Sequence, residues 1–246
     1  MKKCKVCGGM CDTIGDGRYM CDCCGATYTE DDFKTKKETS REGTKDSDMG
    51  ADIFEKNVNG VLELSVSNGR ASGYLISDDG YALTNAHAVS LDNGRSCGQC
   101  TVKCAGESVS ARVVAMGTEN NDEHTTNKDL ALLKLSRVPN KATPLKFGDY
   151  DKVRTGERIF VIGNSLGAGT CITSGIVSDK DRHSQLMYDC ATNPGNSGGP
   201  VFNADGLVIG THVAGTSPNG FKAQGMNYAI PCSAVFTFLR KCGINI

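Results

Sequence analysis

Three residues in separate parts of the chain have the types and surroundings that covalent catalysis needs. Ser197 lies in the glycine-rich run 194–200, His87 follows the apolar run 81–84, and Asp129 directly precedes the apolar run 130–135. A serine hydroxyl is a weak nucleophile unless a histidine accepts its proton and an acid orients that histidine. Backbone N–H groups of a glycine-rich loop can stabilise the oxyanion that such an attack creates. These residues therefore predict acyl-transfer chemistry.

Gly195, Ser197 and Gly199 also match the nucleophile elbow of the α/β-hydrolases, but the surrounding sequence does not. That motif needs a helix directly after the serine and a catalytic histidine later in the chain. Here Ser197 is followed by two strand-like runs, and the only later histidine, His212, lies inside the second. The chain order His, Asp, Ser is the one that fits.

The first 28 residues hold a second chemical pattern. Cys4 and Cys7 form one Cys-x2-Cys-Gly unit, and Cys21 and Cys24 form another. Two such pairs can place four thiolates about 2.3 Å from one tetrahedral Zn²⁺. The segment resembles a zinc ribbon, and we expect structural Zn²⁺ to supply most of its folding energy. A redox-active or merely cysteine-rich arm is the alternative.

The remaining cysteines carry weaker signals. Cys11 and Cys23 do not fit the ribbon pattern, and Cys23 could compete with its neighbours for the ion. Cys97, Cys100 and Cys104 form a lone Cys-x2-Cys with one extra thiol. We expect reduced cysteines in a loop or hairpin there. A second metal site completed by Cys104 or His124 is the alternative.

Charge and composition limit the partners. The chain of 246 residues has 27 basic and 28 acidic side chains, so its net charge of −1 gives no general attraction to nucleic acid or anionic lipid. No apolar run approaches the ~18 residues of a membrane span, and the first residues lack an apolar leader core. Thirteen cysteines without such a leader favour reduced thiols. The sequence therefore predicts a cytoplasmic protein that binds neither membrane nor nucleic acid.

The sequence divides into three parts. Residues 1–28 form the ribbon, residues 29–51 a charged flexible linker, and residues 52–246 a larger domain. In the larger domain, short β-branched runs alternate with turn signals, which is typical of an all-β sandwich or barrel. A helix with Val235, Phe238 and Leu239 on one face is expected over 231–241.

The larger domain resembles the trypsin-like, chymotrypsin-fold serine peptidases, and among them the HtrA/DegP-like group. The resemblance spans about residues 53–242. The stretches that carry it are 72–87, 128–134, 161–167, 189–200 and 225–231.

This resemblance implies two six-stranded antiparallel β-barrels with a C-terminal helix, and a serine endopeptidase acting on polypeptides through an acyl-enzyme. His87, Asp129 and Ser197 would be the triad, with the N–H groups of Gly195 and Ser197 as oxyanion hole. Substrate-binding positions would be Ala191, Thr211, His212 and Val213. No cofactor is expected for catalysis.

Ala191 stands where a trypsin-type enzyme carries an acid, so the expected P1 residue, on the amino side of the cleaved bond, is small or medium and apolar. HtrA-like chains usually carry a PDZ domain after the peptidase, whereas this sequence ends at Ile246. We therefore expect no PDZ regulation, and a ribbon that docks a protein partner. A catalytically silent peptide-binding module recruited through its ribbon is the alternative, and a nucleic-acid binder is disfavoured by charge.

Overall fold

The computed structural model describes residues 2–4, 9–33, 48–66, 69–117, 128–214 and 225–246. The chain divides into two compact units, Met1–Ser47 and Asp48–Ile246. Among the described residues, no helix is long and apolar enough to cross a membrane.

The first unit is a small antiparallel sheet in the order β1-β2-β3-β4. The strands are β1 (Lys2–Lys3), β2 (Met10–Gly15), β3 (Arg18–Cys21) and β4 (Thr27–Thr29), followed by the short helix α1 (Glu30–Phe33). Phe33 packs at 5.3 Å between ring centroids against both Tyr19 and Tyr28. The sequence assigned Phe33 to the linker, but its ring belongs to this unit. The linker residues 34–47 lie outside the described part of the chain.

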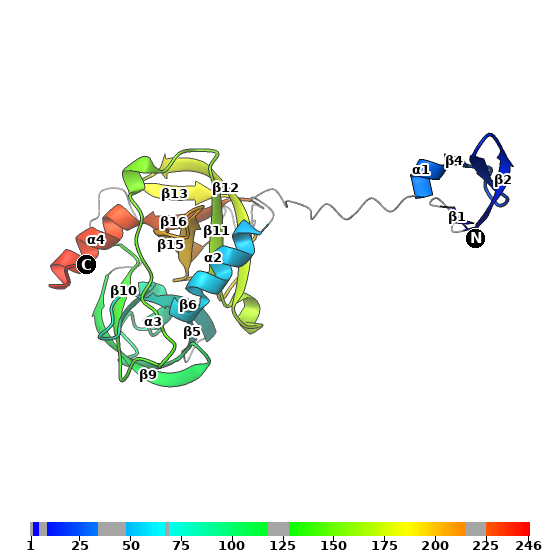
Figure 1. Ribbon diagram of the computed structural model, residues 1–246. Helices are drawn as coiled ribbons and strands as arrows, with labels where there is room; N and C mark the ends of the chain where they lie inside the picture. Colours follow the sequence, from blue (N-terminus) through cyan, green and yellow to red (C-terminus); the bar gives the residue numbers. More distant parts are fainter. Residues whose placement is uncertain (1, 5–8, 34–47, 67–68, 118–127, 215–224) are drawn as a thin grey trace. The chain divides into compact units, whose positions relative to one another are not determined.

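The second unit begins with helix α2 (Met49–Asn57) and a 3₁₀ turn, η1 (Val58–Gly60), and then forms a closed barrel in the order β10-β7-β6-β5-β8-β9 (Figure 1). Its strands are β5 (Val61–Val66), β6 (Gly69–Leu75), β7 (Tyr81–Thr84), β8 (Gln99–Cys104), β9 (Glu107–Met116) and β10 (Ala131–Leu135). Helix α3 (Ala86–Val89) directly follows β7.

A second closed barrel follows, in the order β11-β12-β13-β16-β15-β14. Its strands are β11 (Arg158–Gly163), β12 (Cys171–Arg182), β13 (Gln185–Tyr188), β14 (Pro200–Asn203), β15 (Val208–Ala214) and β16 (Asn227–Pro231). Two 3₁₀ turns, η2 (Tyr150–Lys152) and η3 (Ser165–Gly167), flank β11, and helix α4 (Cys232–Lys241) packs against β15 and β16 (Figure 1). The predicted all-β, double-barrel fold with a C-terminal helix is confirmed.

One apolar core joins the two barrels. Tyr74 and Leu132 from the first barrel share a buried cluster with Phe160, Phe202 and Ile230 from the second. Burial of apolar area is the main favourable term in folding, so this shared cluster stabilises the two barrels against each other. Within it, the Tyr74 hydroxyl and Thr211 Oγ1 are 2.8 Å apart and hydrogen-bonded. The shared core fixes how the two barrels pack against each other.

In the larger domain, the sequence predicted a loop or hairpin around Cys97, Cys100 and Cys104, and the structure has a hairpin there, made by β8 and β9. Cys100, Val102 and Cys104 point into the barrel core, while Thr101 and Lys103 are exposed. This is the two-residue alternation of a half-buried strand, in which reduced cysteines serve as small apolar side chains. Counting these cysteines as apolar would have revealed the strand.

Candidate active site

The first barrel holds an acid–histidine pair. Asp129 lies just before β10, and His87 lies in α3 at the end of the β7 run. One carboxylate oxygen of Asp129 is 2.7 Å from His87 Nδ1, and the other accepts a 2.9 Å hydrogen bond from the His87 backbone N–H. Asp129 is 2% exposed. The pair therefore orients the imidazole by both its ring and its main chain.

Asn85 ties the two supporting segments together. Its side-chain Nδ2 donates a 2.8 Å hydrogen bond to the Asp129 carbonyl oxygen, and Asn85 immediately precedes α3. The segment that carries the acid is thus bonded to the segment that carries the histidine. This contact gives Asn85 a positioning role.

The second barrel carries Ser197 in the loop before β14. Gly198 has φ = +83°, and a Cβ there would lie 2.3 Å from both the Ser72 carbonyl oxygen and Thr84 Oγ1. The Gly198 N–H donates a 2.8 Å hydrogen bond to the His212 carbonyl. Only glycine allows the nucleophile loop to come this close to the first barrel.

Ser72 on β6 links this loop to the first barrel by two hydrogen bonds and makes a third to Asn164. Its backbone N–H donates to the Ser197 carbonyl at 2.8 Å, and its hydroxyl donates to the Gly195 carbonyl at 2.7 Å. The same hydroxyl accepts from the Asn164 backbone N–H at 2.8 Å. Ser72 is completely buried. Both residues of the expected oxyanion hole are therefore held through this one side chain and its peptide group.

The turn before Ser197 fixes the direction of the Gly195 N–H group. The Asn196 N–H donates to the Asn193 carbonyl at 3.1 Å across Pro194 and Gly195, and Gly195 has φ = +102°. Proline followed by a residue with positive φ is the signature of a type II turn. The Pro194 carbonyl accepts from Leu166 N–H at 2.8 Å. Because carbonyl and N–H point in opposite directions in a trans peptide, the Gly195 N–H is directed away from Leu166.

Ser197 Oγ donates a 2.9 Å hydrogen bond to the Val213 carbonyl. A hydroxyl has one proton to donate, so in this state that proton points to Val213 rather than to His87. Rotation about the Cβ–Oγ bond of Ser197 redirects this proton.

The four expected substrate-binding residues have different surroundings. Ala191 is exposed, and Val213 is half-buried beside Ser197. Thr211 is buried and its hydroxyl is bonded to Tyr74. The His212 N–H donates to Gly199 at 2.8 Å, so this edge of β15 is already paired at His212. Any pairing of this edge with a substrate backbone would therefore have to use Val213.

Sequence reasoning missed Ser72 and Tyr188. Tyr188 is fully buried, and its hydroxyl lies 2.5 Å from His212 Nδ1. Ser72 opens the stretch 72–87 that the sequence singled out, but a lone serine in a strand carries no signal of its contacts. Both contacts join segments far apart in the chain, which only the folded structure brings together.

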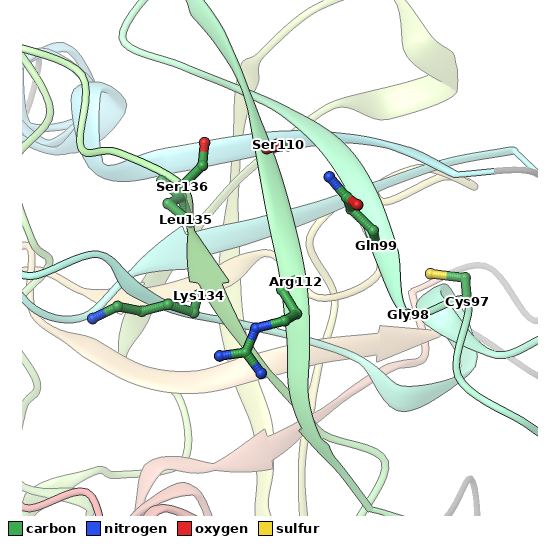
Figure 2. A pocket seen from close by; sticks show the side chains of 8 residues that line it. All are labelled: Cys97, Gly98, Gln99, Ser110, Arg112, Lys134, Leu135 and Ser136. Atoms are coloured by element: carbon green, nitrogen blue, oxygen red, sulfur yellow. The ribbon is translucent and has the colours of Figure 1, made fainter.

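The second cysteine group belongs to the wall of the first barrel. Burial raises the pKa of both Cys100 and Cys104 to about 11. Cys97 lines a shallow hollow of about 550 Å³ on β8, β9 and β10, where Gln99, Arg112 and Lys134 stand on adjacent strands (Figure 2). No triad residue lines this hollow. His124 lies outside the described residues.

The cysteines whose sulfur atoms lie close together in the first unit differ from the four that the sequence predicts as zinc ligands. The Sγ atoms of Cys4, Cys11 and Cys21 lie within 4.8 Å of one another, and Cys24 Sγ is 3.6 Å from Cys4 Sγ. Sulfurs 2.3 Å from a tetrahedral zinc would be about 3.8 Å apart, so these spacings fit a thiolate-bound metal. Cys11, which the sequence pattern excluded, is part of the group. Cys7 lies outside the described residues.

Comparison with known proteins identifies the larger unit. The family model described as "Trypsin-like peptidase domain" matches residues 71–210. The chain belongs to this family. The match contains His87, Asp129 and Ser197, and it confirms the resemblance inferred from the motifs.

Relatives narrow the comparison to one group. A "Probable periplasmic serine endoprotease DegP-like" from Brucella suis is 37% identical over 171 residues, which are 67% of this chain and 31% of the relative. A protein of the same description from Rhizobium meliloti is 36% identical over 171 residues, again 67% of this chain and 31% of the relative. The chain thus aligns with about a third of the length of these relatives.

Solved structures agree with this grouping. The HtrA-type protease AlgW with tripeptide has a TM-score of 0.66 and 30% identity, covering 78% of this chain and 62% of that one. A serine endoprotease from Yersinia pestis has a TM-score of 0.63 and 26% identity, covering 78% and 65%. Most of this chain therefore has the same fold as these proteases.

These comparisons correct one prediction. The sequence predicted a cytoplasmic protein, but the relatives are named periplasmic proteases, which points to the periplasm instead. The prediction rested on cysteine content and on the polar first residues. The cysteines of β8 are buried in the core of the first barrel, so their presence reflects packing and carries no information about the cellular compartment.

The surroundings of His212 generate a prediction about stability. Burial, reinforced by the positive charge of His87, lowers the pKa of His212 to about 4, against a smaller opposite effect of the Tyr228 backbone. Between the ordinary pKa near 6.5 and about 4, the unfolded chain binds a proton that the folded chain does not. Stability contributed by neutral His212 is therefore lost as the pH falls through this window, by about 3 kcal/mol in all.

Urea unfolding at pH 7 and pH 4.5 measures this effect. We expect the free energy of unfolding to fall less from pH 7 to pH 4.5 in His212→Leu than in the wild type. The control His183→Asn, which alters an exposed histidine, should show the same fall as the wild type. An equal pH dependence in His212→Leu and the wild type would contradict a neutral, buried His212.

Proposed function

We propose that the chain is a serine endopeptidase in which Ser197 is the nucleophile, His87 the general base and Asp129 the residue that orients it. The two-point contact between Asp129 and His87 carries the proposal, because a histidine held by both its ring and its main chain is preorganised for proton transfer. The family match supports the same assignment.

In the proposed reaction, Ser197 Oγ attacks the carbonyl carbon of the scissile peptide while His87 Nε2 accepts the hydroxyl proton. The carbonyl π electrons move to oxygen, and that oxyanion accepts hydrogen bonds from the N–H groups of Gly195 and Ser197. Collapse breaks the C–N bond as His87 returns the proton to the leaving amine. Water then attacks the acyl-enzyme with His87 again as base, and this releases the acid and Ser197.

Substrate binding at Val213 would start this reaction. In the free protein its carbonyl accepts the Ser197 hydroxyl. An extended substrate that adds alongside β15 brings its own N–H donors to this edge. We propose that the P1 N–H takes the Val213 carbonyl, so that the Ser197 proton turns to His87. A silent peptide-binding module would use the same strand edge but would leave Ser197 unreactive.

The proposed substrates are polypeptides in extended form. The HtrA-type protease AlgW has been solved with a tripeptide and with a decapeptide, and this chain aligns with 62% and 66% of AlgW in those two structures. Ala191 supplies no charge for a Lys or Arg side chain. From that position alone, a small or medium apolar P1 residue remains the sequence-based prediction.

We propose that the first unit binds one structural Zn²⁺ through Cys4, Cys21 and Cys24, with Cys7 as the fourth ligand expected from the sequence and Cys11 as its competitor. The thiol spacings support this site. So small a sheet has little apolar core, so the metal would supply much of its folding free energy. Docking of a protein partner is the role proposed for it.

Fluorophosphonate labelling tests the nucleophile. The probe phosphonylates a serine whose hydroxyl is activated and whose oxyanion hole is formed. We expect labelling of the wild type and its loss in both Ser197→Ala and His87→Ala, with Ser77→Ala, a change in an exposed turn, labelled normally. A folded wild type that resists the probe would contradict the proposal and favour a silent binder.

Metal analysis tests the zinc site. We expect about one zinc per chain in purified full-length protein, and its loss in Cys21→Ser but not in Cys171→Ser, a change in the second barrel. Comparing Cys7→Ser with Cys11→Ser identifies the fourth ligand, because only the true ligand lowers zinc affinity strongly. Wild-type protein that is free of zinc after purification with added metal and without chelator would overturn the assignment.

A further inference from the structure

Cys11 lies directly opposite Cys21 in the small sheet of the first unit. Strands β2 and β3 are antiparallel, and these two residues are partners in their register. The Asp22 N–H donates to the Met10 carbonyl at 3.1 Å, so residues that flank the pair make the hydrogen bond between the strands. Cys11 and Cys21 therefore form a non-hydrogen-bonded pair, the kind in which facing side chains come closest.

This pairing has the dimensions of a disulfide site. Residues opposed in a non-hydrogen-bonded pair have Cα atoms about 4.5 Å apart, and disulfides join Cα atoms about 4.4–6.8 Å apart. The Sγ atoms of Cys11 and Cys21 lie within 4.8 Å of each other. Rotation of the two side chains can bring the sulfurs to the roughly 2.05 Å of a bond without a change of strand register.

The same two cysteines belong to the proposed zinc site. Cys4 Sγ lies within 4.8 Å of both, and Cys24 Sγ is 3.6 Å from Cys4 Sγ. A metal ligand must be a thiolate, whereas a sulfur in a disulfide has no thiolate to offer. Because Cys21 is one of the proposed ligands, a disulfide between Cys11 and Cys21 removes it from the site. Zinc and the disulfide therefore exclude each other at Cys21.

Cys11 is a surplus thiol beside this site. A structural zinc takes four ligands, and Cys4, Cys21 and Cys24 with the expected Cys7 already supply them. The relatives of the larger unit are named periplasmic proteases, and disulfides form and persist in the periplasm. In such a compartment the surplus thiol competes with the metal by pairing with one of its ligands.

We propose that Cys11 and Cys21 form a reversible disulfide whose formation releases Zn²⁺ from the first unit. The inference rests on the zinc site of the proposed function. The oxidant is itself a disulfide, such as oxidised glutathione. One thiolate of the pair attacks a sulfur of the oxidant and displaces its other half as a thiolate. The second cysteine then attacks the mixed disulfide and displaces the remaining half. The pair thus loses two electrons and two protons, which reduce the oxidant to two thiols.

Redox titration of the full-length protein tests this exchange. The protein is reduced, freed of zinc, equilibrated in glutathione buffers of rising oxidised fraction, alkylated and mapped by peptide mass spectrometry. We expect a peptide pair linked through Cys11 and Cys21. Free Zn²⁺ at about 100 times its dissociation constant should raise the ratio [GSSG]/[GSH]² at the midpoint about 100-fold, because zinc binds only the reduced unit.

Variants of the surplus thiol test its role in zinc release. Zinc-loaded Cys11→Ala and Cys11→Val, compared with the wild type at equal zinc occupancy, should keep their zinc longer in oxidised glutathione, because Cys21 then lacks its partner. Cys23→Ser changes an exposed cysteine of the same unit and should release zinc as the wild type does. Equal zinc release from the wild type and both Cys11 variants would overturn the proposal.

The outcomes separate the disulfide from the zinc site. Reduced protein that binds zinc but gives no link between Cys11 and Cys21, or links Cys4 to Cys24 instead, overturns the disulfide and leaves the zinc site standing. A link between Cys11 and Cys21 whose midpoint does not respond to zinc overturns the competition between them. Reduced protein that binds no zinc overturns the zinc site and the exchange together.

Discussion

The active site depends on a hydrogen-bonded link between the two barrels. His87 and Asp129 belong to the first barrel and Ser197 to the second, so no single barrel holds the proposed triad. Ser72 of the first barrel forms hydrogen bonds to the second. Its N–H donates to the Ser197 carbonyl, and its hydroxyl donates to the Gly195 carbonyl. The shared apolar core brings the barrels together, but apolar packing has no direction. Ser72 supplies the directional contacts that orient the nucleophile loop.

The same loop connects catalysis with recognition. Gly198 and Gly199 bond the main chain of His212, and Val213 holds the Ser197 hydroxyl. A shift of the Ser197 loop would therefore move His212 and Val213 as well. The loop needs glycine at Gly195 and Gly198, because positive φ and close backbone approach exclude a side chain there.

Much of this architecture is predictable from local sequence. Helix α4 was expected almost residue for residue, because its periodicity and end signals are local. The triad was predicted from three local motifs in one chain order. The β8 hairpin was expected only as one of two alternatives, loop or hairpin, because its cysteines were weighed for their chemistry instead of their size. Ser72 contacts the Ser197 loop, and Tyr188 contacts His212. Each contact joins segments that are far apart in the chain, so no local sequence pattern predicts it.

The link through Ser72 is tested most directly by Ser72→Ala, with Ser77→Ala as a control in an exposed turn. Steady-state kinetics and the rate of fluorophosphonate labelling would be measured beside the urea midpoint. The account predicts that kcat falls by about tenfold or more while KM changes little, since the oxyanion hole acts in the transition state. Labelling should slow in parallel. An unchanged kcat in a folded Ser72→Ala variant would contradict it.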